Sequence, residues 1–300
     1  MKSGFVALIG RPNAGKSTLL NRLVGQKLAI VSDKPQTTRN RITGVRNFPE
    51  GQVVFVDTPG VHRPLHRLNV RMVDAALEAL REVDTVAVIV DATDAPGGGD
   101  RFLVDTVTKF DKPKVLVLNK VDALAKEQLL PMIERYGAMG AFSDIVPVSA
   151  LNGDNVERLE RVLLSHLPDG EPLYDEDYLT DQPERFFVAE LVREQVLQHT
   201  RAELPFSSAV IVDRFEEPDE KGLLRLYCTI LVERESQKPI VIGRGGDMIK
   251  AIGTAARKEL ERFFDARVFL DLRVKVRADW REDERMLDTL GLPQAKRRRR

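Results

Sequence analysis

A glycine-rich loop near the start of the chain is the first segment whose residues could do chemistry. Residues 10–17 read GRPNAGKS and fit the pattern G-x-x-x-x-G-K-[ST], after an apolar run and before a helical one. In such a loop, backbone N–H groups and a helix N-terminus converge on phosphate oxygens; Lys16 reaches the β and γ phosphates and Ser17 offers its hydroxyl to Mg²⁺. The nucleotide-binding residues predicted here are Gly10, Arg11, Pro12, Asn13, Ala14, Gly15, Lys16, Ser17 and Thr18.

A second motif, DTPG, begins with Asp57 directly after the apolar run 53–56. At the carboxyl end of a strand, that carboxylate would lie beside the phosphate loop and could hold Mg²⁺, while the N–H of Gly60 could contact a γ-phosphate. The residues predicted to bind nucleotide from this segment are Asp57, Thr58, Pro59, Gly60 and Val61.

The polar loop 33–41, DKPQTTRNR, lies between these two motifs. A threonine there can complete Mg²⁺ coordination only when a γ-phosphate is present, which would make the loop a switch. Thr38 is predicted for this role, with Thr37 as the alternative. Lys16, Thr38 and Gly60 are the predicted catalytic set.

The motif NKVD at 119–122 selects the base. Guanine presents two donors that a single carboxylate, Asp122, can accept together, whereas adenine would leave that carboxylate unpaired. Asn119, Lys120 and Val121 are predicted to brace the loop and pack on the base. Ser149, Ala150 and Leu151 follow another apolar run, and the N–H of Ala150 is predicted to donate to guanine O6. The sequence therefore predicts a site for GTP and GDP.

One position bears on the rate of hydrolysis. Ras-like GTPases use a glutamine after the DxxG motif to orient the attacking water. Val61 occupies that position here and can neither donate nor accept a hydrogen bond, so slow intrinsic hydrolysis is expected. His62 is an alternative water-positioning group, or else a solvated loop residue.

The motifs need elements that bring them together. Short β-branched runs at 5–9, 53–56, 86–90, 115–118 and 145–148 alternate with helix-like segments at 17–23, 70–80, 101–110 and 156–167. Apolar runs of this kind are typical of strands covered by helices on both faces. The pattern predicts an α/β domain over residues 1–170 with a mostly parallel, doubly wound sheet.

The remainder of the chain has a different pattern. An acidic linker is predicted at 171–185, followed by a helix at 186–201, strands at 208–215 and 223–233, a short apolar strand at 240–242, a helix at 247–264 and a strand at 268–276. This predicts a small α+β domain over 186–281. Its order is predicted as αββααβ, in which the run 239–242 takes the place of a helix, although residues 240–242 are also interpreted as a short strand before the glycines. A C-terminal segment, 282–300, closes on the basic run KRRRR.

Charge and composition exclude several classes of protein. The net charge is +0, but residues 171–233 carry 6 Lys and Arg against 15 Asp and Glu, and residues 234–281 carry 12 against 7. A basic stretch after an acidic one indicates one face aimed at a polyanion. The single cysteine excludes a disulfide framework, and no apolar run is long enough to span a membrane. A chain that opens directly into a strand is expected to be cytoplasmic, although the basic tail could contact an anionic membrane peripherally.

Taken together, these motifs resemble those of a known protein family. GRPNAGKS, QTTRNR, DTPGVH, NKVD and SAL are similar to the Era-type GTPases of the TrmE–Era–EngA class, and residues 231–250 and the closing WREDERMLDTLG are similar to its C-terminal KH region. The resemblance covers nearly all of residues 1–293. It implies a GTP-hydrolysing factor that binds 16S rRNA near its 3′ end and assists assembly of the 30S subunit. It also implies that Asn13 holds a K⁺ ion.

The GRGG segment at 243–246 fits the GXXG loop of a type II KH domain. Such a loop lets a nucleic-acid backbone approach closely and clamps about four nucleotides. Ile240, Ile242, Ile249 and Ile252 are expected to form apolar walls for bases, with core packing as the alternative for Ile240 and Ile249. The predicted RNA-binding residues are Lys238, Gly243, Arg244, Gly245, Gly246, Lys250, Arg257 and Lys258.

Two other functions share some of these motifs. A P-loop kinase acting on a small molecule is disfavoured by NKVD and by the lack of a second acidic substrate loop. A GTPase of a membrane or tRNA-modification system is disfavoured by the GXXG segment and by the absence of a membrane-spanning run.

Overall fold

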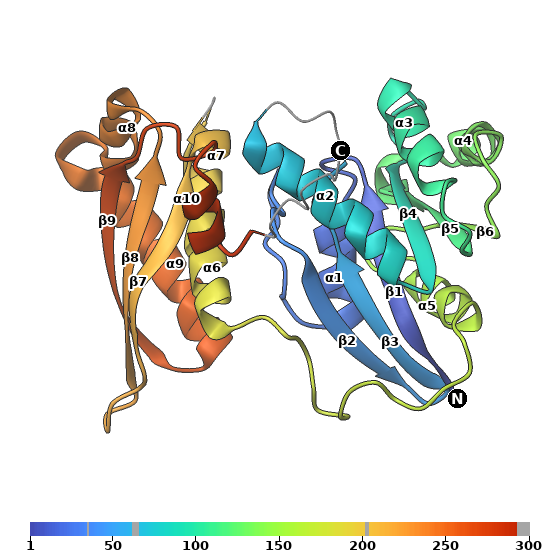
Figure 1. Cartoon of the computed structure of the whole chain (residues 1–300), viewed down its shortest axis with the longest axis horizontal. Helices are drawn as coiled ribbons and strands as arrows, with labels where there is room; N and C mark the ends of the chain where they lie inside the picture. The colour runs from blue at the N-terminus through green and yellow to red at the C-terminus, as the bar shows by residue number, and fades with distance from the viewer. Residues whose placement is uncertain (35, 62–65, 202–203, 293–300) are drawn as a thin grey trace.

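The computed structural model describes residues 1–34, 36–61, 66–201 and 204–292, which form two domains side by side (Figure 1). The first domain contains a mixed sheet with helices on both faces. Its elements are β1 (Lys2–Gly10), α1 (Lys16–Val24), β2 (Ile42–Phe48), β3 (Gly51–Asp57), α2 (Arg67–Glu82), β4 (Thr85–Asp91), α3 (Gly98–Val107), β5 (Lys114–Asn119), the 3₁₀ turn η1 (Val121–Ala123), α4 (Lys126–Gly137), β6 (Asp144–Pro147) and α5 (Val156–Ser165).

The strand order is β2-β3-β1-β4-β5-β6, and every neighbouring pair is parallel except β2 with β3. This confirms the predicted mostly parallel sheet. The strand β2 was not predicted, because its sequence ITGVRNF has no continuous apolar run. Parallel pairing aligns the carboxyl ends of the strands, so the residues that follow β1, β3, β5 and β6 share one edge of the sheet.

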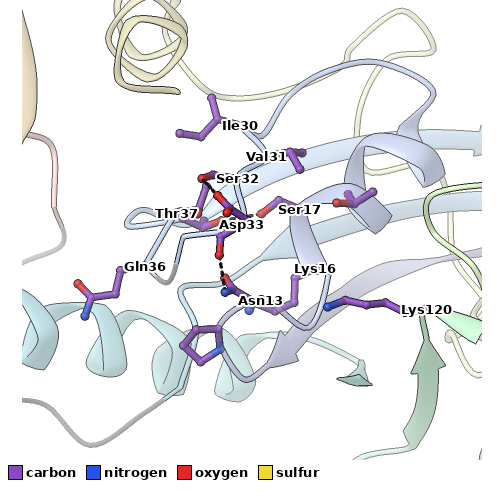
Figure 2. Close-up of a pocket in the computed structure, with 15 residues that line it drawn as sticks. Asn13, Lys16, Ser17, Ile30, Val31, Ser32, Asp33, Gln36, Thr37 and Lys120 are labelled. Carbon is purple, nitrogen blue, oxygen red and sulfur yellow. Dashed lines mark hydrogen bonds between the residues drawn. The ribbon is translucent and has the colours of Figure 1, made fainter. Parts of the chain in front are cut away.

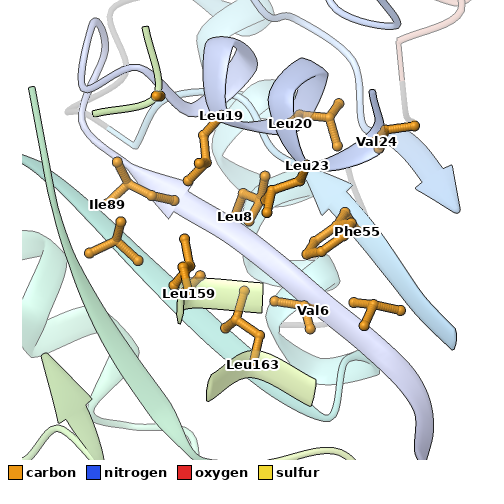
Figure 3. Close-up of a cluster of buried hydrophobic side chains, with 14 of the residues drawn as sticks. Val6, Leu8, Leu19, Leu20, Leu23, Val24, Phe55, Ile89, Leu159 and Leu163 are labelled. Carbon is orange, nitrogen blue, oxygen red and sulfur yellow. The ribbon is translucent and has the colours of Figure 1, made fainter. Parts of the chain in front are cut away.

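The core of this domain lies on both faces of the sheet. On one face, Leu19, Leu20 and Leu23 of α1 pack against β1 and β3, next to Leu159 and Leu163 of α5 (Figure 3). These leucines recur at helical spacing and are fully buried. Each buried leucine stabilises the fold by about 1.5–3 kcal/mol, so this face holds the phosphate loop rigidly between β1 and α1.

The second domain has the predicted helices and strands with two differences, the added helix α7 (Leu204–Ser207) and a helix in place of the strand predicted at 240–242. Its elements are α6 (Glu184–His199), α7 (Leu204–Ser207), β7 (Ala209–Glu216), β8 (Leu223–Val232), the turn η2 (Glu235–Gln237), α8 (Lys238–Ile242), the turn η3 (Arg244–Gly246), α9 (Asp247–Phe264), β9 (Arg267–Val276) and α10 (Glu284–Thr289). In its sheet, β8 pairs antiparallel with β7 and parallel with β9. The order αββααβ is confirmed, with the short α7 as an addition.

The predicted strand at 240–242 is wrong, because these residues form the helix α8. Periodicity cannot separate a helix from a strand in so short an apolar run. Pro239 lies in the first turn of the helix, and Gly243 ends it with φ 79°. Only Val241 of the run is fully buried, whereas Ile240 remains 50% exposed.

Two segments connect the domains. The acidic linker runs along the free edge of β2, where Val45 N–H donates to Leu179 O at 2.8 Å and Thr180 Oγ1 donates to Thr43 O at 2.6 Å. The C-terminal segment 280–292 returns to α2 and forms a small apolar cluster with it. Within the described ranges, no helix is both long and apolar enough to cross a membrane.

Candidate functional site

The sheet edge carries a pocket of about 340 Å³ between the phosphate loop and the loop 30–38 (Figure 2). Asn13 and Lys16 enter it from the phosphate loop, and Lys120 enters from the base-recognition motif. Its lining is Pro12, Asn13, Gly15, Lys16, Ser17, Thr18, Ile30, Val31, Ser32, Asp33, Gln36, Thr37, Thr38, Gly60 and Lys120. The residues 30–33 and Gln36 were not predicted, since apolar and acidic loop residues have no phosphate-binding pattern of their own.

Glycine is required at two positions of the pocket because other segments of the chain pass close to them. A Cβ on Gly15, which has φ +90°, would lie 2.2 Å from Asn119 Nδ2. A Cβ on Gly60 would lie 2.9 Å from the backbone nitrogen of Pro12. The absence of side chains therefore lets three segments, far apart in sequence, meet around the phosphate position.

Lys16 is held ready in the phosphate loop. Its side chain is buried, and Nζ donates to the carbonyl oxygens of Gly10 at 3.3 Å and Arg11 at 3.0 Å. Burial lowers the pKa of Lys16, and the carboxylate of Asp57 opposes that shift. A buried lysine whose ammonium group is bound to two backbone carbonyls is well placed to exchange them for phosphate oxygens.

The three predicted magnesium ligands lie close together where the loop 30–38 meets the phosphate loop. Ser17 Oγ lies 2.6 Å from Thr38 Oγ1 and donates to Asp57 Oδ2 at 2.9 Å, and Thr38 Oγ1 lies 3.3 Å from the same oxygen. The alternative, Thr37, donates its hydroxyl to Lys34 O instead. The geometry therefore favours Thr38 over Thr37, and the role of Thr38 as a magnesium ligand stays a prediction.

The environment of Asp57 fits a divalent cation. The side chain is fully buried, and Oδ1 has no hydrogen-bond partner among the described residues. Burial raises the pKa of this carboxyl to about 6, despite the opposing effects of Lys16, Ser17 and Thr38. A buried carboxylate with an unused oxygen and two neighbouring hydroxyls is the oxygen-rich donor set that Mg²⁺ prefers.

We expect Asp57→Asn to abolish the effect of magnesium on nucleotide affinity. In the wild type, adding Mg²⁺ should tighten binding of the GTP analogue GDPNP; in the variant that gain should fall at least tenfold, because a neutral amide is a weak ligand. Thermal unfolding without nucleotide should show a Tm at least as high as that of the wild type, since a buried charge is removed. A variant that keeps the magnesium effect would contradict this assignment.

The base-recognition segments are braced against the phosphate loop. Asn119 Nδ2 donates to Ala14 O at 2.8 Å, and Ser149 Oγ donates to Asp122 Oδ1 at 2.6 Å, which orients that exposed carboxylate. Lys120 has φ 67° and pairs with Asp91. The N–H of Ala150 donates to Asn119 Oδ1 at 3.0 Å, so its predicted bond to guanine O6 stays a prediction.

Several predicted nucleotide-binding residues have other side-chain partners. Arg11 forms a 2.9 Å ion pair with the buried Asp100 of α3, and Thr58 Oγ1 donates to Leu8 O at 2.9 Å. Val61 is buried, and its N–H donates to Gly10 O at 3.2 Å. These three residues hold the loops in place through their side chains or backbone. His62 lies outside the described residues.

A second hollow, of about 520 Å³, lies in the other domain between α9 and β9. Ile249, Lys250 and Arg257 line it from α9, and Phe269, which is 46% exposed, lines it from β9. The wall formed by β9 was not predicted, because alternation along a strand does not tell which face a helix leaves open. Lys238 and Lys258 are not part of the lining.

The GXXG loop lies at the N-terminus of α9, next to this groove. Gly243 has φ +79°, and a Cβ on it would lie 2.6 Å from Met248 N, so glycine is required there. Gly245 and Gly246 also have positive φ, but open space surrounds them, and Arg244 is exposed. Ile252 is fully buried in the core, so its predicted role as a wall for bases is wrong. Ile249 is the predicted isoleucine that lines the groove.

Comparisons with known proteins agree with both sites. A family model described as "50S ribosome-binding GTPase" matches residues 5–120, and one described as "KH domain" matches residues 203–281. The chain is 51% identical to the GTPase Era of Geotalea uraniireducens over 290 residues, which is 97% of each chain. It is also 51% identical to the GTPase Era of Geobacter metallireducens over 97% of each chain.

Two solved structures share the whole fold. One is a single-substitution variant of Aquifex aeolicus Era bound to GDP·AlF₄⁻, with 40% identity, a TM-score of 0.94 and coverage of 98% of this chain and 100% of that one. The other is Era in complex with MgGDPNP and nucleotides 1506–1542 of 16S ribosomal RNA, with the same identity, TM-score and coverage. These relatives exclude the kinase alternative, because the domain they share is a GTPase domain. With half of its residues identical to curated relatives along nearly its full length, and with both the nucleotide pocket and the KH groove in place, the chain belongs to the Era family of GTPases.

Proposed function

We propose that this GTPase binds the 3′-terminal region of 16S rRNA in its KH groove and thereby assists assembly of the 30S subunit. The observation that carries the proposal is the groove between α9 and β9, which has apolar walls, two cations and an open GXXG loop at one end. Single-stranded RNA needs such a surface, because its bases stack or pack on apolar walls while its phosphates meet cations and helix N-termini. The relative solved with an RNA has the same fold over 98% of this chain.

Crosslinking the protein to RNA in cells of its source organism, followed by sequencing of the bound RNA, tests this proposal. Reads should concentrate at the 3′ end of 16S rRNA, and depletion of the protein should leave unprocessed 30S precursors. Reads spread evenly over tRNA or mRNA would refute the assignment.

The nucleotide site supports hydrolysis by positioning and charge. Mg²⁺, held by Ser17, Thr38 and Asp57, would neutralise charge on the β and γ phosphates. Lys16 can exchange its two carbonyl partners for phosphate oxygens. Gly60 lines the pocket, and its N–H is expected to donate to the γ-phosphate. Val61 offers no polar side chain to orient water. Slow hydrolysis without a partner is the expected result.

We further propose that Asn13 holds a K⁺ ion beside the phosphates. Asn13 has φ 64° and lines the pocket, and its Nδ2 donates to Asp33 O at 2.8 Å, so its amide oxygen is the ligand atom it can offer (Figure 2). Wild-type hydrolysis should be faster in KCl than in NaCl at equal ionic strength. Asn13→Ala should remove most of that difference and leave GDP affinity nearly unchanged.

Phosphate-release assays in the two salts measure this effect. Asn47→Ala is the matched control, because Asn47 also donates its amide to a backbone carbonyl, that of Glu176, and lies outside the pocket. Equal wild-type rates in KCl and NaCl would overturn the potassium assignment.

The basic tail, 296–300, lies outside the described residues; contact of that tail with RNA or with an anionic membrane surface stays a prediction.

A further inference from the structure

The residue that follows Thr38 is anchored in the other domain. Arg39 is 5% exposed, and its guanidinium donates to Ser208 O at 2.8 Å, to Pro205 O at 3.2 Å and to Phe206 O at 3.4 Å. It also lies over the ring of Trp280, 5.6 Å from the centroid. Trp280 is fully buried, and its Nε1 donates to Ser207 O at 2.9 Å. A planar guanidinium with this many acceptors holds its backbone in a defined place.

A second arginine of the KH domain binds the same loop. Arg193 of α6 is 2% exposed and donates to Thr37 O. It also forms a bidentate pair with Glu190, at 2.7 and 2.6 Å. Thr38 therefore lies between two residues that are bound to the KH domain, Thr37 through its carbonyl and Arg39 through its guanidinium. The hydroxyl of Thr38 lies at Ser17 and Asp57.

These contacts depend on the docked arrangement of the domains. Arg39 and Arg193 are both buried, and Glu190, which is hydrogen-bonded to Arg193, is the carboxylate whose charge also acts on Arg39. Within the described part of the chain, the hydrogen bonds that Arg39 donates go to backbone carbonyl groups. Burial, and then the charge of Arg193, lower the pKa of Arg39 to about 9. A buried arginine without a carboxylate of its own is costly, and undocking would return its charge to water. The contact is thus suited to form and break rather than to hold the domains together permanently.

The second nucleotide-sensing segment is held by the same domain. Residues 280–292, which contain the WREDERMLDTLG motif, contact α2, the helix that follows the DTPG loop in the chain. Leu68 N–H donates to Arg281 O at 3.1 Å. The buried Arg71 pairs with Glu284 and, at 2.7 Å, with Asp288. Both elements that could respond to a γ-phosphate are therefore attached to the C-terminal part of the chain.

We propose that Arg39 is the positioning residue through which docking of the KH domain places Thr38 in the magnesium site, with the carbonyl groups of Pro205, Phe206 and Ser208 and the ring of Trp280 as its receptor. This inference rests on the proposed function in one respect, namely that the KH domain binds RNA. Its consequence is reciprocal coupling: a γ-phosphate that orders Thr38 stabilises the docked arrangement, and whatever stabilises docking tightens binding of the γ-phosphate.

Arg39→Lys tests the inference without RNA. The variant keeps the charge but cannot span three carbonyls or stack as a plane. In Mg²⁺, its affinity for GDPNP should fall at least fivefold relative to wild type, while its affinity for GDP, which lacks the γ-phosphate that Thr38 senses, should stay within twofold. If the role of Arg39 were merely structural, the variant would bind both nucleotides more weakly by the same factor, or its Tm would be lower. Either result, or unchanged affinities, would overturn the inference.

Arg41→Gln is the matched control. Arg41 lies in the same loop, but it forms an ion pair with Glu82 of its own domain, at 2.5 Å. It should keep the wild-type ratio of GDPNP to GDP affinity. If Arg41→Gln lowers the ratio of GDPNP affinity to GDP affinity as much as Arg39→Lys does, any disturbance of the loop lowers GDPNP affinity. The contact of Arg39 with the KH domain is then not the cause, and the inference fails.

An RNA arm separates this inference from the proposed function. With an oligomer of the 16S rRNA 3′ end, wild-type protein should bind about fivefold or more tightly in GDPNP than in GDP, the lower limit of typical allosteric coupling. In Arg39→Lys the two RNA affinities should become equal, with the GDP-state affinity unchanged. Absence of RNA binding in wild type would refute the proposed function, whereas RNA binding that ignores the nucleotide would refute only the coupling through Arg39.

Discussion

Asp122→Asn should lower GTP affinity by two or more orders of magnitude and make xanthosine triphosphate the preferred nucleotide. The carboxylate is expected to accept two hydrogen bonds from guanine, and an amide places a donor where guanine also donates. Xanthine carries a carbonyl at that position, so the amide donor finds an acceptor. Sites built on buried polar pairs reject the unmatched ligand by large factors.

Competition binding of GTP, xanthosine triphosphate and ATP to the wild type and the variant measures this switch. Ser149→Ala is an informative companion, because it removes only the hydroxyl that donates to Asp122 Oδ1 at 2.6 Å. We expect it to weaken GTP by about tenfold or less, corresponding to roughly 1 kcal/mol for one hydrogen bond, without changing base preference. If Asp122→Asn still prefers GTP, the guanine contact lies elsewhere in the pocket.

Replacing Arg244 and Gly245 together by aspartate should reduce RNA binding more than a hundredfold and leave GTP binding within a few-fold of wild type. The change turns the loop charge from +1 to −2 and places carboxylates where phosphates must pass. Folding should survive, because among the described residues no atom beyond the chain neighbours of Gly245 lies within 4 Å of a Cβ placed there, and aspartate tolerates its φ of +62° better than most residues.

The hairpin of the same domain provides a matched control. Lys221 and Gly222 are also a basic residue followed by a glycine with positive φ and open surroundings. Lys221→Asp with Gly222→Asp makes the same change in charge at the end of the groove that is remote from the GXXG loop, next to Leu223, which lines the groove. Gel shifts and phosphate release on both double variants should therefore differ only in RNA binding. Equal loss in both would mean that total charge, not the GXXG loop, governs RNA affinity.

The motifs that meet at the nucleotide pocket could be predicted from the sequence, whereas residues 30–33 and Gln36 of its lining could not. Each of its motifs follows a buried strand, and parallel strands bring their carboxyl ends to one edge whatever the rest of the chain does. The motifs GRPNAGKS and NKVD therefore predict both the ligand that they bind and their place at the edge of the sheet. The exceptions are local: α8 was mistaken for a strand because its apolar run is short, and β2 was missed because edge strands need no continuous apolar run.

The sequence by itself determined the guanine nucleotide, the phosphate loop and the GXXG loop, because these are set by neighbours in the chain. Only the tertiary structure decided between Thr37 and Thr38, which lie side by side in sequence and differ in the partners of their hydroxyls. It alone showed that Arg39 reaches Ser208, 169 positions away, and that 280–292 returns to α2. Such contacts arise from the packing of two domains, and no local periodicity records which buried polar group meets which carbonyl.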